Sequence, residues 1–247
     1  MLRRLIYPVP SYDGAEHETT KGGTHLLHRP APSGGRTVVY MHGNGSDLAS
    51  VSPLAGLFAH HGLGFAAVEY PGYGPAAGQR TTQRAILAAA ADGLAHLREQ
   101  GLTSAQTVLV GESLGSSVAA HLTADGHLTD DEGGVLRCDG GASKGSGRLV
   151  LVSPFTSMTA MVRRVVRVFP RLLVPDRWET DALAPRIGVP TLLVHGAQDS
   201  LVPPQMSAAL AAVIPDVHRV VVDGRDHNTL WEAPSDALAV VANFARA

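Results

Sequence analysis

A serine between two glycines is the first feature of the sequence that could carry chemistry. The stretch from Gly111 to Gly115 reads G-E-S-L-G and follows the apolar run Thr107–Val110. We expect a strand to end here and a helix, Ser113–Ala124, to begin. Side chains two positions before and after Ser113 would collide with the neighbouring backbone, which is why this turn needs glycine at both places. The turn would expose the hydroxyl at a helix N-terminus, where N–H groups favour developing negative charge.

Two further residues could activate this serine. A hydroxyl is a weak nucleophile until a base removes its proton, and the base needs an acid that holds its tautomer. Asp199 and His227 each come shortly after an apolar run. The carboxyl ends of parallel strands meet at one edge of a sheet, so we expect both side chains beside Ser113. Asp226 is the alternative acid, but a carboxylate next to the histidine in sequence is poorly placed to accept from its ring.

A third stretch could stabilise the oxyanion of a tetrahedral intermediate. His42–Gly45 reads H-G-N-G and follows the apolar run Thr37–Met41. An oxyanion needs two preorganised donors. We expect these to be the backbone N–H of Leu114, directly after the nucleophile, and that of Asn44, where the flanking glycines let the backbone turn inward.

The alternation of short β-branched runs with longer Ala/Leu-rich runs predicts a mostly parallel sheet with helices on both faces, an α/β fold. The clearest predicted strands are Thr37–Met41, Gly64–Glu69, Thr107–Val110, Arg148–Val152, Thr191–His195 and His218–Val222. Predicted helices are Leu48–His61, Thr82–Glu99, Ser113–Ala124, Pro203–Val213 and Pro234–Ala245. Weaker strands near Leu2–Tyr7, Glu16–Thr20 and Thr24–His28 would form an antiparallel edge. We expect one domain, 1–247.

Composition limits the classes of function. The 247 residues carry a formal net charge of −2, which gives no general affinity for nucleic acid. A single cysteine excludes an internal disulfide framework and a zinc site built from several thiolates. No run reaches the ~18–20 apolar residues of a membrane span, and the charged, proline-interrupted start does not resemble a signal peptide. We expect a cytoplasmic protein without cofactor or metal.

Two segments interrupt the alternation. Residues 125–147 are rich in glycine and polar residues, which predicts a flexible insertion. Residues 154–190 are too long for a simple crossover and contain apolar residues at helical spacing, with three arginines on the other side: Arg163, Arg164 and Arg167. This segment is either a covering helix with a solvated basic face or a cap that offers its arginines to phosphate headgroups at a membrane surface.

Several residues near the predicted site could contact a substrate. The candidates are Gly43, Tyr70, Tyr73, Phe155 and Met158. The tyrosines lie in a Pro/Gly-rich loop after Gly64–Glu69, and the last two follow Arg148–Val152. Packing within the loop or the core is the alternative for each aromatic residue and for Met158.

Together these motifs resemble the α/β-hydrolase-fold serine hydrolases of the abhydrolase-domain family. The likeness is greatest to the branch with protein depalmitoylases and lysophospholipid or monoacylglycerol lipases. It rests on H-G-N-G at 42–45, E-Y-P-G-Y-G at 69–74, the Ser113 turn, S-P-F-T-S at 153–157, the stretch 195–203 and D-H-N at 226–228. The resemblance implies an eight-stranded core, a Ser113–Asp199–His227 triad and no cofactor. The cysteine-rich N-terminus of some depalmitoylases is absent.

The sequence thus predicts a serine hydrolase that cleaves carboxylic esters or thioesters through an acyl-enzyme. A peptidase or a carbon–carbon bond hydrolase could use the same three residues. A non-catalytic binding protein on a hydrolase fold is the alternative outside the enzymes.

Overall fold

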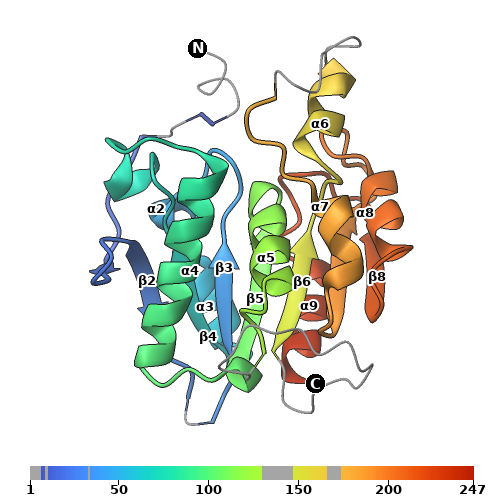
Figure 1. Cartoon of the computed structure of the whole chain (residues 1–247). Coiled ribbons are helices and arrows are strands. Elements are labelled where there is room, and N and C mark those ends of the chain that lie inside the picture. The colour runs from blue at the N-terminus through green and yellow to red at the C-terminus, as the bar shows by residue number, and fades with distance from the viewer. Residues whose placement is uncertain (1–6, 9–10, 33, 130–146, 166–173) are drawn as a thin grey trace.

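A single eight-stranded sheet organises the chain (Figure 1). The computed structural model describes residues 7–8, 11–32, 34–129, 147–165 and 174–247. The strand order is β1-β2-β4-β3-β5-β6-β7-β8. The strands are β1 (Glu18–Thr19), β2 (His25–Arg29), β3 (Thr37–Met41), β4 (Gly64–Val68), β5 (Thr107–Glu112), β6 (Arg148–Val152), β7 (Thr191–Gly196) and β8 (Val217–Val222). Strands β1 and β2 pair antiparallel, β2 pairs antiparallel with β4, and every other pair is parallel. The predicted mostly parallel sheet with an antiparallel edge is confirmed.

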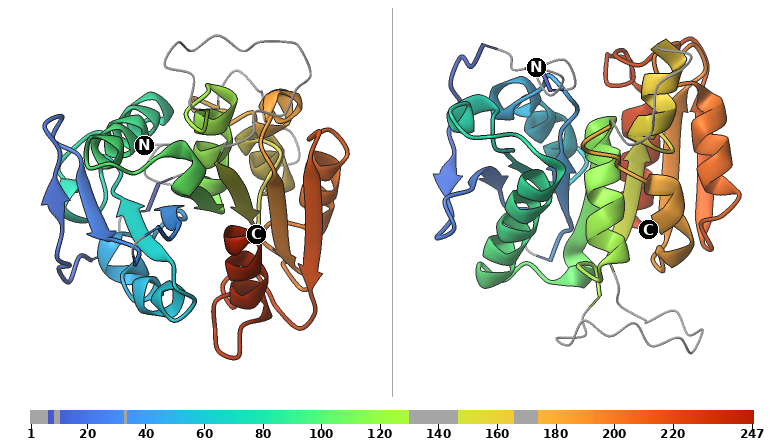
Figure 2. Two further views of the ribbon diagram at one scale, coloured as in Figure 1. Left: turned by 90° about the horizontal axis from the view of Figure 1, so that it is seen from below. Right: turned by 45° about the horizontal axis from the view of Figure 1, so that its top comes forward.

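Helices cover both faces of this sheet, as the view from below shows (Figure 2). The α-helices are α2 (Leu48–Val51), α3 (Leu54–Ala59), α4 (Gln83–Glu99), α5 (Leu114–Ala124), α6 (Met158–Val165), α7 (Thr180–Leu183), α8 (Pro204–Ala211) and α9 (Asp236–Arg246). Three 3₁₀ turns, η1 (Gly74–Ala76), η2 (Ser104–Gln106) and η4 (Ala184–Arg186), complete the described elements. One apolar core lies between the sheet and α4, α5 and α8, and a second lies between the sheet and α2, α3 and α9.

The central strands are buried on both faces, which is why their sequences are nearly all apolar. Every residue of β3 and β4 is buried, as expected for strands between two helical layers. Helix α4 begins where Thr82 accepts a hydrogen bond from the N–H of Ala85, a side-chain cap that replaces a missing intrahelical bond. Strands β3, β5, β6 and β7 run parallel to one another. The loops that follow them therefore emerge at one edge of the sheet, the upper edge in Figure 1.

One predicted helix is two. The expectation of a continuous helix over Leu48–His61 is wrong, since α2 ends at Val51 and α3 begins at Leu54. Pro53 lies at the break, and proline cannot donate the backbone hydrogen bond that would continue α2. The short α2 is instead fixed at its start, where Asp47 and Ser50 cap each other.

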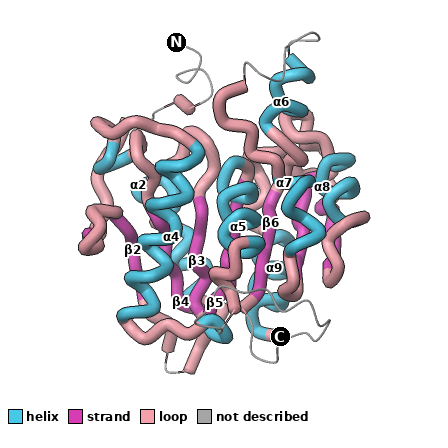
Figure 3. The backbone as a smooth tube through the Cα atoms, viewed as in Figure 1, coloured by secondary structure: helices cyan, strands magenta, loops and turns pink. Residues whose placement is uncertain are grey.

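Three predictions fall wholly or partly on residues outside the described ranges. They are the strand near Leu2–Tyr7, the insertion at 125–147 and the far end of the helix that carries Arg167. Helix α6, which the tube in Figure 3 shows beyond the upper strand ends, contains Arg163 and Arg164. In the ranges given above, no helix is long and apolar enough to cross a membrane.

Candidate active site

Ser113 occupies a strained turn between β5 and α5. Its φ is +50°, a region that costs a non-glycine residue on the order of 1–3 kcal/mol. A Cβ at Gly111 would lie 2.2 Å from the carbonyl oxygen of Gly115, and one at Gly115 would lie 1.9 Å from that of Met41. Neither position can hold a side chain without moving backbone. The steric reason predicted for the G-x-S-x-G spacing is confirmed.

The structure brings the three predicted side chains together. The Ser113 hydroxyl donates to Nε2 of His227, with 3.0 Å between Oγ and Nε2. The opposite ring nitrogen, Nδ1, donates to Oδ2 of Asp199 over 2.7 Å. Because a carboxylate only accepts, Nδ1 carries the hydrogen and Nε2 is left to accept the serine proton. This chain of hydrogen bonds is the arrangement that a base-activated serine requires.

Two hydrogen-bonded loops carry the acid to the histidine. The N–H of Gln198 donates to the carbonyl oxygen of Arg225 over 2.8 Å. Gly196 makes this approach possible, since a Cβ there would lie 2.4 Å from the same oxygen. The loop with Asp199 thus lies directly against the loop with His227, although 28 positions separate the two residues.

Asp199 is buried but remains a carboxylate. Burial alone would raise its pKa, yet hydrogen bonds from His195, His227 and the backbone N–H of Val202 outweigh that effect and hold the pKa of Asp199 well below its usual range. A carboxylate that accepts several such bonds is stabilised in its charged form. Asp199 can therefore keep His227 in one tautomer and stabilise the imidazolium formed during the reaction.

Asp226, the alternative acid, stabilises the turn in which it lies. Oδ1 of Asp226 accepts from the N–H groups of Asn228 and Thr229, and the residue is exposed. The carboxylate that accepts from Nδ1 of His227 is that of Asp199. The sequence argument against a carboxylate adjacent to the histidine is confirmed.

The predicted oxyanion loop lies against the nucleophile. A Cβ at Gly43 would be 3.6 Å from Cβ of Ser113, so the loop backbone is in van der Waals range of the reacting serine. The side-chain oxygen of Asn44 accepts from the Tyr73 hydroxyl over 2.6 Å. Leu114 is the first residue of α5, where helix N–H groups lack intrahelical partners. The assignment of Asn44 and Leu114 as oxyanion donors stays a prediction.

Beneath this loop lies a buried histidine–carboxylate pair that the sequence did not predict. Nε2 of His42 lies 2.9 Å from Oε1 of Glu69, and both side chains are fully buried. Glu69 also accepts from the N–H groups of Leu48 and Tyr70. The signal available in the sequence was two polar residues directly after neighbouring apolar strands. This pair anchors the start of the oxyanion loop.

The aromatic substrate candidates are packing residues. Tyr70 and Tyr73 have no exposed surface and Phe155 has 2 %, so the expectation of substrate contact is wrong for these three. The Tyr70 ring stacks on His42 with 4.0 Å between centroids. Tyr73 holds Asn44 through its hydroxyl. Met158 is half-buried against the core and remains, with Gly43, a candidate for substrate contact.

A second buried carboxyl group lies next to the nucleophile. Glu112 accepts a short hydrogen bond from the Tyr40 hydroxyl. Burial raises the pKa of Glu112, and the bond from Tyr40 and the nearby charge of His227 oppose that rise. The sequence analysis assigned no role to this residue, because the middle positions of G-x-S-x-G accept many side chains.

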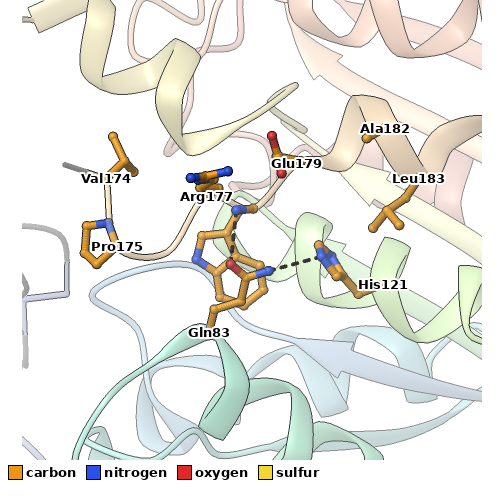
Figure 4. Close-up of a pocket in the computed structure, with 9 residues that line it drawn as sticks. Gln83, His121, Val174, Pro175, Arg177, Glu179, Ala182 and Leu183 are labelled. Carbon is orange, nitrogen blue, oxygen red and sulfur yellow. Dashed lines mark hydrogen bonds between the residues drawn. The ribbon is translucent and has the colours of Figure 1, made fainter. Parts of the chain in front are cut away.

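A separate hollow opens beside α5 (Figure 4). It has a volume of about 530 Å³, and its lining includes Gln83, His121 and Trp178. Nδ1 of His121 donates to the carbonyl oxygen of Ser117, and Nε2 accepts from the Gln83 amide. Gln83 in turn accepts from the N–H of Trp178. Both ring nitrogens are therefore committed, and His121 offers no free base in this hollow.

No group of three or more His, Cys, Asp or Glu side chains suited to a metal ion occurs among the residues that the structure describes. The chain is similar over residues 171–234 to the family model described as alpha/beta hydrolase fold. That stretch contains both Asp199 and His227.

Known proteins are similar to this chain over most of its length. The protein Rv2307c of Mycobacterium tuberculosis is 29 % identical over 247 aligned residues, with 92 % of this chain and 80 % of the relative covered. An esterase of Pyrococcus furiosus is structurally similar with a TM-score of 0.68, 17 % identity and 95 % of each chain covered. A puromycin-hydrolysing peptidase of M. tuberculosis has a TM-score of 0.66 and 16 % identity, with 93 % of this chain and 37 % of the peptidase covered. At these identities the structural likeness concerns the fold.

Proposed function

From the α/β-hydrolase fold of this chain, we propose that it is a serine hydrolase that cleaves carboxylic esters or thioesters through an acyl-enzyme. The observation that carries the proposal is the unbroken hydrogen-bond chain from Ser113 Oγ to His227 and on to Asp199. A serine hydroxyl needs this chain to attack a carbonyl carbon at neutral pH. The strained turn of Ser113 also supports the proposal, since it places the hydroxyl within reach of His227 and such strain is frequent at active sites.

The proposed reaction has the following steps. The Ser113 hydroxyl passes its proton to Nε2 of His227 as Oγ bonds to the carbonyl carbon. The N–H groups of Leu114 and Asn44 hold the oxyanion, and each such donor is worth on the order of 100-fold or more in rate. The carbon–oxygen or carbon–sulfur bond then breaks, and the leaving group takes the proton from His227. Water, deprotonated by His227, hydrolyses the acyl-enzyme and restores Ser113.

The proposed substrates are acyl esters or thioesters of lipids or proteins, in keeping with the resemblance to depalmitoylases and lysophospholipid or monoacylglycerol lipases. Met158 and Met161 of α6, which are only partly buried at the upper edge of the sheet, are the evidence for an apolar substrate. Methionine adapts to flexible apolar chains.

A graded substrate series tests this proposal. The purified protein is assayed with p-nitrophenyl esters and acyl thioesters of increasing chain length, and with matched amides. We expect ester and thioester turnover that disappears in Ser113→Ala. Turnover of amides in preference to esters would indicate a peptidase. A folded protein inert to every substrate would favour a non-catalytic binding role.

We further propose that the basic side of α6 contacts anionic lipid, in a protein that is otherwise cytoplasmic. Arg163 and Arg164 are exposed, and one guanidinium nitrogen of Arg164 donates to the carbonyl oxygen of Ser200 over 3.3 Å. Arg167 lies outside the described residues. Sedimentation with anionic and neutral vesicles tests the contact, since each basic residue near an anionic surface contributes about 1 kcal/mol. The proposal would be contradicted if wild type bound both kinds of vesicle equally. It would also be contradicted if an Arg163→Gln/Arg164→Gln variant bound anionic vesicles as well as wild type does.

A further inference from the structure

A second histidine contacts the carboxylate that orients His227. Nε2 of His195 lies 3.3 Å from Oδ2 of Asp199, the same oxygen that accepts from His227. It also lies 2.8 Å from the carbonyl oxygen of Val202. Carbonyl and carboxylate oxygens only accept, so Nε2 of His195 carries the hydrogen. It donates this hydrogen to the carbonyl oxygen of Val202, and Oδ2 of Asp199 lies in electrostatic contact with the same N–H. Asp199 thus lies between two imidazole rings.

The remaining contacts close this arrangement. Oδ1 of Asp199 accepts from the N–H of Val202 over 2.8 Å. His195 therefore holds the two ends of the Asp199–Val202 turn, one through the carboxylate and one through the carbonyl. Both the His195 and Asp199 side chains are fully buried, so bulk water does not compete with this contact in the intact protein.

The other nitrogen of His195 identifies the ring as a neutral donor. Its Nδ1 is buried and has no hydrogen-bond partner among the described residues. A hydrogen on Nδ1 would leave a buried N–H unsatisfied, which is costly. The ring therefore supplies one N–H and no charge, which suits it to orient Asp199 without competing with the imidazolium that forms on His227.

We propose that His195 is a positioning residue for the triad, whose Nε2–H keeps Oδ2 of Asp199 aimed at Nδ1 of His227. This inference rests on the proposed function, because it assigns His195 a part in the hydrolytic cycle. Without the N–H, the carboxylate can rotate about its Cβ–Cγ bond and leave His227 without a fixed acceptor. The loss would fall on the chemical step and leave substrate binding intact.

Two substitutions that differ in the position of one N–H test the proposal. In His195→Gln the amide nitrogen reaches about as far as Nε2, whereas in His195→Asn it reaches only about as far as Nδ1. We expect His195→Asn to lower kcat about tenfold with KM unchanged, the effect of one lost hydrogen bond to a charged group. His195→Gln should restore kcat to within about threefold of wild type.

A spectroscopic readout separates positioning from a general loss of stability. The proton NMR resonance of the His227 Nδ1–H, assigned by its disappearance in Asp199→Asn, reports the hydrogen bond to Asp199 directly. It should shift or broaden in His195→Asn and persist in His195→Gln. If His195→Asn does not fold, His195→Gln decides: a retained resonance and kcat support the proposal, and a tenfold loss of kcat overturns it.

The outcome is distinguishable from failure of the proposed function. If wild type turns over no ester or thioester, the proposed function fails. If wild type is active through Ser113 but the Asn and Gln variants have equal kcat and the same His227 resonance, only the role of His195 is contradicted.

Discussion

Two buried histidine–carboxylate pairs lie at the same edge of the sheet, and only one of them reaches the nucleophile. His42 with Glu69 and His195 with Asp199 are alike in that all four side chains are fully buried. The two carboxylates differ in their remaining partners. Among the described residues, Glu69 accepts from His42 and otherwise from backbone N–H groups, whereas Asp199 also accepts from His227.

The difference shows what makes a buried histidine–carboxylate pair part of a reactive site. The His227 side chain is 11 % exposed and extends the pair of Asp199 to Ser113 at the surface. The contacts of the Glu69 pair lead only to backbone N–H groups and to the start of the oxyanion loop. A buried carboxylate thus contributes to chemistry only if one of its donors is itself in reach of substrate, and otherwise it stabilises the fold.

Replacing each carboxylate by its isosteric amide should give the largest difference in kcat between the two pairs. Asp199→Asn should lower kcat on the order of 10³- to 10⁴-fold, because the amide can donate to His227 and favour the wrong tautomer. Glu69→Gln should lower kcat by less than about tenfold but destabilise the fold by about 1–3 kcal/mol, the cost of weakening a buried hydrogen-bonded group. Steady-state kinetics and urea unfolding on both variants measure these effects. Equal losses of kcat would remove the distinction between the pairs.

A single hydroxyl links the structural pair to the oxyanion loop. Tyr73→Phe removes the hydrogen bond to Asn44, and we expect kcat to fall about fivefold, as for one hydrogen bond of about 1 kcal/mol. KM should change little, since the ground-state carbonyl gains less from the loop than the oxyanion does. Kinetics with one ester at saturating and limiting concentrations tests this. A rise in KM at constant kcat would place the Tyr73 contact in substrate binding.

Acid should weaken the pair of Asp199 in a defined direction. The pKa of Asp199 is lowered in the folded state, so its charge stabilises the fold fully above the ordinary aspartate pKa of about 3.9. This contribution is lost as the pH falls below that value towards the lowered native pKa. The difference in unfolding free energy between wild type and Asp199→Asn should therefore be constant from pH 7 to about 5 and shrink below about 4. A difference that grows on acidification would contradict the assignment.

Glu112 should show the opposite sign and the smallest effect. Its pKa is raised by burial, so the folded state loses stability as the pH rises from the ordinary glutamate value of about 4.3 through the raised one. Glu112→Gln keeps an acceptor for Tyr40 and removes that loss. We expect a gain within about 1 kcal/mol at pH 7 that disappears near pH 4. Urea unfolding at both values measures it, and a pH-independent difference would refute it.

The sequence predicted the triad but neither of the two buried histidine–carboxylate pairs, for a physical reason. Ser113, Asp199 and His227 follow apolar strands, and parallel strands bring such positions to one edge whatever the details of packing. The role of Glu69 depends on which side chain of a strand end turns inward. Periodicity does not report that direction. The same holds for His195, whose apolar strand predicted burial but not its contact with Asp199.

The prediction that the aromatic residues contact substrate is wrong for a related reason. Tyr70 and Tyr73 lie in a loop at the reactive edge, and loops at that edge often contact ligands. Their rings instead turn inward and fill the space around His42. Pro53 marks the break between α2 and α3 in the sequence. The apolar periodicity continues across this proline and so predicts one helix where there are two.

Covalent labelling tests the central claim most directly. Incubation of the intact protein with a fluorophosphonate, followed by digestion and mass spectrometry, locates the nucleophile without any assumption about substrate. We predict one adduct per chain, on Ser113, that is absent in Ser113→Ala and forms far more slowly in Asp199→Asn. An adduct that persists in Ser113→Ala, or a folded protein that takes up no label, would contradict the account.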